Sequence, residues 1–184
     1  MSTVEVRGQF LDIVGVDQTK VDELRRALRG TLLQRDDDGY EKARTIWNEM
    51  IDHRPNLIVR CVGVSDVIAA VNFARAHELF VSVRGGGHNV SGNAVCNGGL
   101  MIALSMMTSV HVDAKRQIAR AEGGATWKDY DRETQVFGLA STGGAVSRTG
   151  IAGLTLGGGW GWLGGRYGLA CDNLLSADLS LIHI

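Results

Sequence analysis

The sequence predicts an α+β fold that contains a parallel β-α-β unit. A strand-like run at residues 57–62, a helical pattern at 65–77 and a second strand-like run at 79–83 follow one another, as in β-α-β units. Glycine is also unusually frequent, with 25 residues in a chain of 184, about twice the average share. Six of them lie between Gly85 and Gly99 and eleven between Gly143 and Gly168. These clusters indicate places where the backbone closely approaches a ligand or another segment.

The composition is that of an ordinary globular protein, with 45% hydrophobic residues, 21% charged residues and a formal net charge of −1. No cluster of Lys and Arg lies on a predicted face, so nucleic acid is not expected as a partner. No apolar run approaches the roughly 18 residues that a membrane span needs. The N-terminus lacks the pattern of a signal peptide. A cytoplasmic protein that does not bind a membrane is therefore expected.

The cysteines and histidines give no sign of a metal site. Cys61, Cys96 and Cys171 are odd in number and far apart, and no C-x-x-C pair is present. The five histidines share no metal-ligand spacing. We therefore expect reduced, mostly buried thiols and no bound metal.

Residues 1–53 are interpreted as a helical lead-in. Thr19 to Asp22 resembles a capping box, Val21, Leu24 and Leu28 follow helical spacing, and Gly30 is a typical stop. A second short helix is predicted over residues 41–51, with Ile46 and Trp47 facing inward. Pro55 marks the passage into the next unit.

The strand at residues 57–62 is followed by a helix that Ser65 caps and that runs to about His77. Its predicted apolar face consists of Val67, Ile68, Val71 and Ala74. Further strands are predicted over residues 100–104, 109–113 and 117–122. A helix follows at 126–137, where Thr126 and Asp129 form a capping box and Gly138 ends the helix.

The glycine loop at residues 85–92 follows the strand at 79–83 directly. Three consecutive glycines remove every Cβ from the turn, so main-chain N–H groups can close on an anion such as a pyrophosphate. His88 then stands on this turn as its one reactive side chain, although a solvated loop histidine is the simpler interpretation of that residue type alone. Ligands of α/β folds bind at the carboxyl ends of strands, so a phosphate-bearing organic cofactor is favoured.

The second glycine cluster, residues 142–161, has no sustained strand or helix period and is expected to fold back as a loop with a short helix. Gly159 to Gly164 matches G-x-G-x-x-G, with Asp178 near the expected distance, but the required helix would contain Gly164, Gly165 and Gly168. A Rossmann nicotinamide site is therefore disfavoured. A P-loop is excluded because its lysine is missing. The aromatic rings of Trp127, Trp160 and Trp162 are expected to pack in the protein rather than enclose a cofactor.

Four ordered motifs carry a resemblance to a known family. They are Arg84 to His88, Gly98 to Ser105, Thr149 to Gly161, and Tyr167 to Leu174. Together they resemble the FAD-binding domain of FAD-linked oxidases, namely the berberine bridge enzyme-like group of the vanillyl-alcohol oxidase and p-cresol methylhydroxylase superfamily. The resemblance implies a domain of two α/β subdomains of the p-cresol methylhydroxylase type.

The resemblance implies a set of cofactor-binding residues. The FAD pyrophosphate would lie on the first loop, and the His88 imidazole would be bonded covalently to the flavin 8α-methyl carbon. The second cluster would line the isoalloxazine and ribityl side, and the residues around Asp172 would help to close the site. The implied residues are Arg84, Gly85, Gly86, Gly87, His88, Asn89, Val90, Ser91, Gly92, Thr142, Gly143, Gly144, Val146, Thr149, Gly150, Gly153, Gly158, Trp160, Asp172, Asn173 and Leu174.

Two of the departures from the family pattern bear on the cofactor link and on the extent of the domain. Val146 aligns with the cysteine of members that hold FAD by two links, so a single link through His88 is expected. Relatives continue beyond Asp178 through another strand and a substrate domain. Residues 179–184 instead resemble the translation of a transposase adapter used in sequencing libraries. We therefore expect residues 54–178 to be a FAD-binding domain that is incomplete at its C-terminus, and 179–184 to be a non-native tail.

The function implied by the resemblance is hydride transfer from a carbon of a small-molecule substrate, such as an alcohol, to covalently bound FAD. Reoxidation by O2 would give H2O2. The catalytic base is expected downstream of this fragment. Two alternatives stay open: a non-covalent FAD dehydrogenase of the same superfamily, and a non-catalytic fragment that binds no cofactor.

Overall fold

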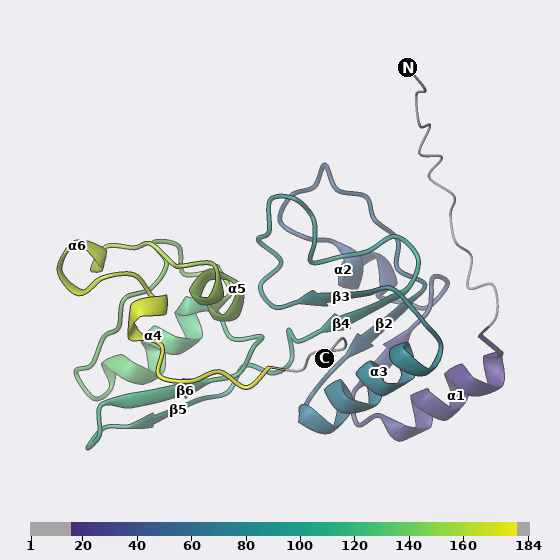
Figure 1. Cartoon of the computed structure of the whole chain (residues 1–184), viewed down its shortest axis with the longest axis horizontal. Coiled ribbons are helices and arrows are strands. Elements are labelled where there is room, and N and C mark those ends of the chain that lie inside the picture. Colours follow the sequence, from purple (N-terminus) through teal and green to yellow (C-terminus); the bar gives the residue numbers. More distant parts are fainter. Residues whose placement is uncertain (1–15, 180–184) are drawn as a thin grey trace.

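The computed structural model of the chain describes residues 16–179, which form two lobes (Figure 1). The first lobe comprises residues 16–104 and contains a four-stranded sheet; the second comprises residues 105–179 and contains a two-stranded sheet. Residues 1–15 of the predicted lead-in lie outside the described residues, as does all of the predicted tail except Leu179. The α+β fold class predicted from the sequence is confirmed.

The sheet of the first lobe has the strand order β1-β2-β4-β3. Strands β2, β4 and β3 are parallel, and β1 is antiparallel to β2. The predicted β-α-β unit is therefore confirmed as β2-α3-β3, with β4 inserted between its two strands. The elements of this lobe are α1 (Gln18–Ala27), β1 (Thr31–Leu33), α2 (Tyr40–Arg44), β2 (Leu57–Arg60), α3 (Val64–Ala76), β3 (Val81–Arg84) and β4 (Leu100–Ala103).

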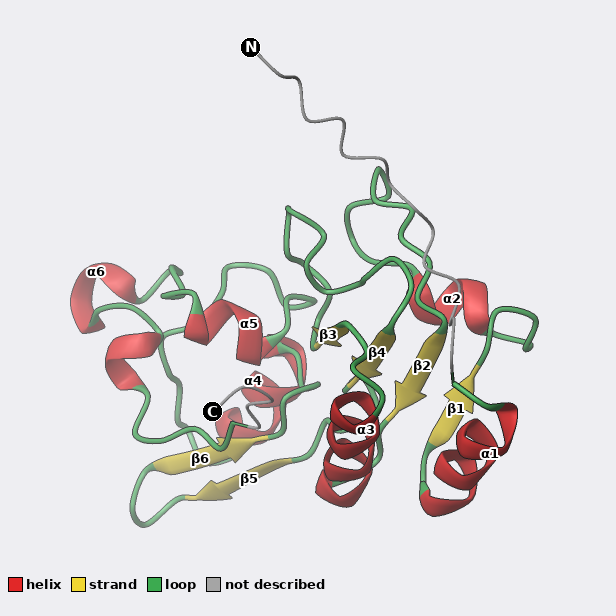
Figure 2. Ribbon diagram, turned by 45° about the vertical axis from the view of Figure 1, so that its right-hand side comes forward, coloured by secondary structure: helices red, strands yellow, loops and turns green. Residues whose placement is uncertain are grey.

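The central strands β2 and β4 are buried on both faces, which explains their unbroken apolar sequence. Leu57 and Val59 point into a core cluster beneath α1 and α3, together with Leu100 and Ile102 of β4. Ile58 instead joins the cluster on the opposite face, with Met101 and Tyr40. Helices α1 and α3 thus cover one face of the sheet (Figure 2). On the other face, α2 and the loops that follow β3 complete the lobe.

Several details of the first lobe differ from the sequence predictions. The cap of α1 is Asp17, whose side chain accepts a hydrogen bond from the Thr19 N–H, and not Thr19 itself. Helix α3 begins after Gly63 without a side-chain cap, so the assignment of Ser65 was wrong. Ile68 is exposed, whereas Ala70 takes a buried place on α3. Sequence spacing alone did not distinguish these neighbouring residues: a local side-chain hydrogen bond makes Asp17 the cap of α1, and packing of α3 against the sheet buries Ala70.

The region predicted as a second helix also differs. Helix α2 ends at Arg44, and residues 31–33 of the lead-in form strand β1, which the sequence analysis missed. Ile46 faces inward as predicted, but Trp47 is 58% exposed, so its predicted inward orientation was wrong.

Asp66 is a buried carboxylate that ties three segments of the first lobe together. It is 1% exposed and accepts hydrogen bonds from the main-chain N–H groups of Arg29 (2.9 Å), Gly30 (3.1 Å) and Val62 (2.9 Å). Burial alone would raise the pKa of this carboxyl, but the three N–H donors and the Arg29 charge lower it below its ordinary value. The negative charge therefore stabilises the loops that flank β1 and β2.

Replacing Asp66 with Asn is expected to lower the free energy of unfolding by about 2–4 kcal/mol, because an amide NH2 would face donors that need an acceptor. The pKa of Asp66 is lowered in the folded state, so its stabilisation is present above the unfolded pKa of about 4. That stabilisation disappears as the pH falls through the folded-state pKa. Urea unfolding at pH 7 and between pH 5 and 2 measures both effects. The exposed Asp38→Asn is the matched control, and equal stability of the two variants would contradict the account.

The second lobe contains the hairpin of β5 (Val110–Asp113) and β6 (Ile118–Ala121), against which α4 (Trp127–Gln135) packs. The predicted capping box is confirmed: Thr126 Oγ1 accepts from the Asp129 N–H, and Asp129 Oδ2 accepts from the Thr126 N–H. Three short elements follow, α5 (Ile151–Leu156), α6 (Gly164–Tyr167) and a 3-10 turn at Cys171–Asn173. No helix among residues 16–179 is long and apolar enough to cross a membrane.

Candidate functional site

The glycine loop at residues 85–92 follows the carboxyl end of β3, at the edge of the sheet that faces the second lobe (Figure 1). Gly87 is buried and has a φ of +71°, a conformation that L side chains rarely adopt. Gly85, Gly86 and His88 are half-buried, and Asn89 to Ser91 are exposed at the tip of the loop. The loop therefore has a constrained base and an open tip.

The main-chain N–H groups of this loop form an unpaired run. From Gly85 to Ser91, none donates a hydrogen bond to any described residue; the next N–H, that of Gly92, donates to the Asn89 carbonyl at 3.2 Å. Successive unpaired N–H groups on a turn form a concave anion site. The predicted ability of the loop to hold a phosphate is thus consistent with its hydrogen bonding.

Arg84 adds a positive charge behind the loop. Its Nη1 donates to the Ala43 carbonyl at 2.5 Å, and its Nε is buried without a partner among the described residues. No described carboxylate forms an ion pair with it. Burial and the neighbouring Arg60 charge lower the pKa of its guanidinium. An unpaired, partly buried cation favours a nearby anion, so the residues present fit the pyrophosphate of FAD.

The two glycine clusters meet at Gly86 and Gly150. A Cβ added to Gly86 would lie 2.6 Å from the Gly150 Cα and closer still to its nitrogen; a Cβ on Gly150 would lie 2.5 Å from the Gly86 nitrogen. The residues on either side of Gly150 are bonded to the main chain at the start of α4. The Ile151 N–H, for example, donates to the Ala125 carbonyl at 2.9 Å. These two glycines are therefore required by the contact between the lobes, whether or not a ligand is bound.

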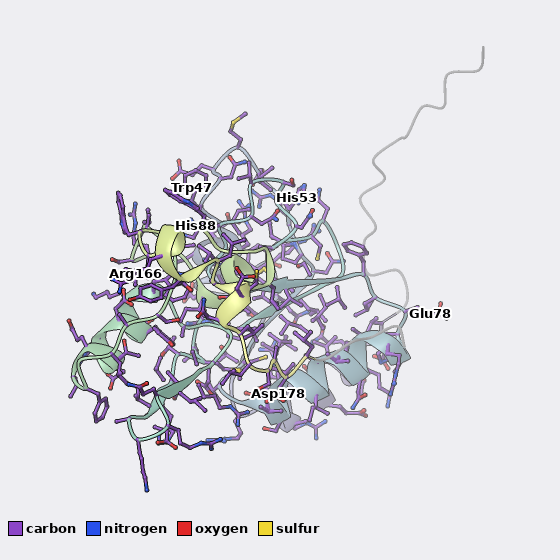
Figure 3. The ribbon with its side chains drawn as sticks, turned by 60° about the vertical axis from the view of Figure 1, so that its left-hand side comes forward. Trp47, His53, Glu78, His88, Arg166 and Asp178 are labelled. Atoms are coloured by element: carbon purple, nitrogen blue, oxygen red, sulfur yellow. The ribbon has the colours of Figure 1, made fainter. Side chains whose placement is uncertain are left out.

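His88 stands at the middle of the loop with its ring against Trp47 (Figure 3). The ring centroids are 5.7 Å apart and the ring planes differ by 22°. Neither ring nitrogen of His88 is hydrogen-bonded to a residue of the described chain, whereas Nδ1 of His53 lies 3.0 Å from the Val95 carbonyl. A free imidazole nitrogen can act as a nucleophile. Both ring nitrogens of His88 are thus without a hydrogen-bond partner among the described residues, whereas Nδ1 of His53 is engaged.

Several predicted residues of the second cluster are engaged in local structure. Thr142 is buried, donates to the Leu169 carbonyl at 3.2 Å and accepts from Asn173 Nδ2 at 2.9 Å. Asn173 Nδ2 also donates to the carbonyls of Tyr167 and Leu169, and Asp172 accepts from the Leu169 N–H at 2.7 Å. Thr142, Asp172 and Asn173 therefore fix the segment at 167–173 against the second cluster.

Gly143 and Gly144 lie against the buried ring of Trp127. A Cβ on Gly143 would come within 2.5 Å of Cε3 of this ring, and one on Gly144 within 3.1 Å of its Nε1. The predicted packing role of Trp127 is confirmed, since the side chain is 4% exposed. Trp160 and Trp162 are 68% and 82% exposed, so neither is a core residue, but their rings contact each other with centroids 6.5 Å apart.

Other predicted residues lie at the surface. Val146 is 51% and Leu174 42% exposed, and a Cβ on Gly153 would meet open space. Gly158 accepts at its carbonyl from the Cys171 N–H, and Thr149 donates to the Val146 carbonyl. At the loop tip Asn89 accepts from the Asn93 N–H at 3.1 Å, while the side chains of Val90 and Ser91 are exposed. The structure therefore brings together the first loop, Thr149 and Gly150, while Val146, Trp160 and Leu174 lie at the surface.

Two residues that were not among the predicted site residues contact the loop from the other side. Trp47 donates its main-chain N–H to the Gly87 carbonyl at 3.0 Å, and Asn48 donates from Nδ2 to the Val90 carbonyl at 2.9 Å. In the sequence, these two residues are an aromatic residue followed by an amide in a polar stretch. Such a stretch has no periodicity that would predict their contact with the loop.

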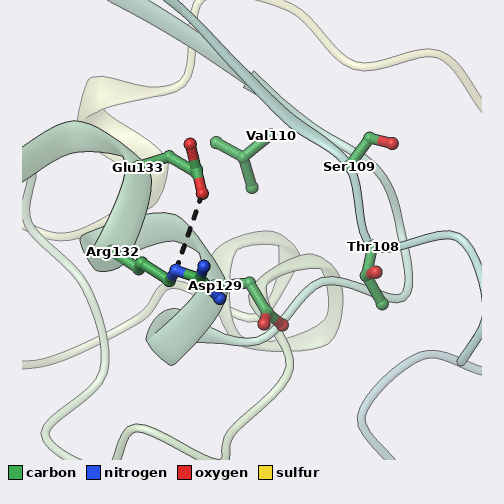
Figure 4. Close-up of a pocket in the computed structure, with 6 residues that line it drawn as sticks. All are labelled: Thr108, Ser109, Val110, Asp129, Arg132 and Glu133. Atoms are coloured by element: carbon green, nitrogen blue, oxygen red, sulfur yellow. Dashed lines mark ion pairs between the residues drawn. The ribbon is translucent and has the colours of Figure 1, made fainter. Parts of the chain in front are cut away.

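One hollow among the described residues lies away from this loop. It has a volume of about 390 Å³ and lies between β5 and α4 (Figure 4), with none of the predicted site residues in its lining. A second hollow of about 240 Å³ lies beside Trp127, Gly143, Gly144 and Trp162. Among residues 16–179, no three His, Cys, Asp or Glu side chains gather to hold a metal ion.

Comparison with known proteins places the chain in a family. Residues 55–181 match the family described as "FAD binding domain". The chain is 40% identical over 153 residues to (R)-6-hydroxynicotine oxidase of Paenarthrobacter nicotinovorans, an alignment that covers 83% of this chain and 33% of that protein. It is 36% identical to the FAD-linked oxidoreductase pgmH of Aspergillus terreus, which covers 91% of this chain and 35% of the relative.

Solved structures of similar fold support the same family assignment. A crystal structure of 6-hydroxy-D-nicotine oxidase from Arthrobacter nicotinovorans has a TM-score of 0.77 and 39% identity, over 79% of this chain and 32% of that one. A chitooligosaccharide oxidase has a TM-score of 0.75 and 26% identity, over 83% and 33%. The chain thus spans about a third of the length of its relatives. It belongs to the FAD-linked oxidoreductases of the vanillyl-alcohol oxidase and p-cresol methylhydroxylase superfamily, which includes the berberine bridge enzyme-like proteins.

Proposed function

We propose that this chain is the FAD-binding portion of a flavin-dependent oxidase. The observation that carries the proposal is the run of unpaired N–H groups from Gly85 to Ser91 in front of the unpaired Arg84 charge. These groups would hold the two phosphates of FAD. Thr149 and Gly150, which contact the same loop from the second lobe, would lie on the flavin side of the cofactor.

His88 would hold the flavin covalently. A ring nitrogen of His88 would be bonded to the flavin 8α carbon, with one hydrogen lost from the 8α-methyl group and the proton lost from the imidazole N–H. O2 would take up the two electrons and the two protons as H2O2. The unengaged ring nitrogens of His88 and its position between the phosphate-binding N–H groups support this assignment. Val146 has no thiol, so we propose one link only.

The chemistry that FAD supplies when bound is acceptance of a hydride from a substrate carbon and return of the two electrons to O2, giving H2O2. The residues of this chain would bind the phosphates, fix the flavin position and hold the two lobes together. The substrate is proposed to be a small molecule with an oxidisable carbon, such as an alcohol; relatives are named for hydroxynicotine and for chitooligosaccharide.

A dehydrogenase is the second candidate, because a similar solved protein, wild-type Phl p 4.0202, is described as a glucose dehydrogenase. In that case the reduced flavin would pass its electrons to an acceptor other than O2. Reduction of the bound flavin followed by mixing with O2 or with an artificial acceptor separates the two. Rapid H2O2 production favours the oxidase, and slow reaction with O2 alone favours the dehydrogenase.

Binding of flavin compounds to the purified chain tests the proposal. FAD is expected to bind at least about tenfold more tightly than riboflavin, since riboflavin lacks the pyrophosphate that the loop would contact. ADP, which carries the pyrophosphate without the flavin, is expected to compete with FAD before the covalent bond forms. Calorimetry at low temperature measures all three. Equal affinities for FAD and riboflavin, or no binding of either by the folded chain, would contradict the proposal.

A further inference from the structure

Residues 47 and 48 form a clasp over the glycine loop from a segment about 40 residues earlier in the chain. The Trp47 N–H donates to the Gly87 carbonyl at 3.0 Å, on one side of His88. Asn48 Nδ2 donates to the Val90 carbonyl at 2.9 Å, on the other side. The two bonds therefore fix the main chain directly before His88 and two residues after it.

The indole ring of Trp47 lies next to the imidazole ring of His88. The centroids are 5.7 Å apart and the planes are within 22° of parallel, so the two rings are stacked with an offset. Trp47 is 58% exposed, which is unusual for so large an apolar side chain. Its ring contact with His88 is the one aromatic contact that it makes within the described chain.

Residues on both sides of the clasp anchor it to the rest of the first lobe. Ile46, the residue before it, is 4% exposed and belongs to the core cluster beneath the sheet. Asn48 Oδ1 accepts from the Met50 N–H at 3.2 Å, and its carbonyl accepts from the Ile51 N–H at 3.0 Å. The clasp is therefore attached to the core on one side and to a hydrogen-bonded turn on the other, which allows it to orient the His88 ring.

We infer that Trp47 and Asn48 are positioning residues for His88. The inference rests on the proposed function, in which a ring nitrogen of His88 bonds to the flavin 8α carbon with loss of one hydrogen from each partner and reduction of O2 to H2O2. The stacked indole restricts rotation of the imidazole and presents one ring edge to the flavin. Orientation of a nucleophile raises the rate of bond formation without strengthening binding.

The substitutions that test the clasp separate the side chain from the main chain. Trp47→Leu removes the ring but keeps the N–H bond to Gly87, and Trp47→Phe keeps a flat ring. Asn48→Ser removes the bond to Val90. Phe80→Leu is the matched control, because Phe80 is 70% exposed before the start of β3, at the opposite end of that strand from the loop. Arg84 anchors the loop to Ala43 in every variant, so the fold is expected to survive.

The rate of covalent attachment is measured by incubating flavin-free protein with saturating FAD and precipitating samples with acid over time. Trp47→Leu and Asn48→Ser are expected to slow attachment by about tenfold, with little change in the initial affinity for FAD. Trp47→Phe is expected to retain most of the rate, and Phe80→Leu all of it. In the flavin-free protein, NMR gives an independent readout: the His88 ring protons are shifted upfield by the indole and lose that shift in Trp47→Leu.

The outcomes are distinct. Attachment in Trp47→Leu and Asn48→Ser at the wild-type rate would overturn the clasp and leave the proposed function standing. So would His88 ring protons that do not move on removal of the indole. If wild-type protein binds FAD but never retains it after acid, the proposed covalent link is wrong and the inference falls with it.

Discussion

Replacing His88 with Ala is expected to give a protein that still binds FAD but releases all of it when the polypeptide is precipitated with acid. The groups of the loop that we propose to bind the phosphates are main-chain N–H groups, which the substitution leaves in place. The ring nitrogen that would form the bond is removed. The measurement compares the visible absorbance of the acid pellet and the supernatant, for wild type and variant, after incubation with FAD.

His53→Ala is the matched control for this experiment. His53 lies in the same lobe, but its Nδ1 is engaged with the Val95 carbonyl at 3.0 Å, so it serves the local structure. The control is expected to keep flavin in the pellet. If flavin remained with acid-denatured His88→Ala, the assignment of the link to His88 would be wrong.

Replacing Gly86 with Ala is expected to separate the two lobes and abolish FAD binding. The added Cβ would lie 2.6 Å from the Gly150 Cα, and main chain borders it, so no flexible side chain can move aside. Overpacking of this kind lowers the free energy of unfolding by about 3 kcal/mol. Urea unfolding and FAD titration measure the two consequences on the same protein.

Gly165→Ala is the control for the glycine substitution, since a Cβ at Gly165 meets nothing within 4 Å and lies in α6. It is expected to change stability by less than about 1 kcal/mol, in the favourable direction that helix propensity predicts. FAD affinity and stability of Gly86→Ala equal to those of this control would show that the lobes do not depend on the Gly86–Gly150 approach.

The sequence predicted those parts of the fold that local patterns determine. The apolar runs of β2 and β4 identified the central strands, and the Thr126–Asp129 capping box marked the start of α4 within one residue. Strand β1 was missed because Thr31–Leu33 is too short to show a period, and its identity comes from pairing with β2. The choice of Asp17 over Thr19 as a cap depended on one side-chain bond that no spacing distinguishes.

Some parts of the candidate site could also be predicted from local sequence patterns, whereas others could not. The glycine loop and His88 were identified from residue type, because only glycine permits such a turn and few side chains offer a nucleophile. The glycine clusters indicated close approach of the backbone to a ligand or another segment, but the contact of Gly86 with Gly150 emerged only from the structure. The clasp of Trp47 and Asn48 could not be predicted, since it depends on a tertiary contact between segments about 40 residues apart.

The central claim is that FAD is bonded to His88, and peptide mapping by mass spectrometry tests it most directly. The protein is incubated with FAD and O2 and digested, and the mass of each peptide is measured. The account predicts that the peptide containing His88 gains the mass of one FAD less two hydrogen atoms, with fragment ions that place the addition on the imidazole. An unmodified His88 peptide from flavin-bound protein, or flavin attached to another residue, would contradict it.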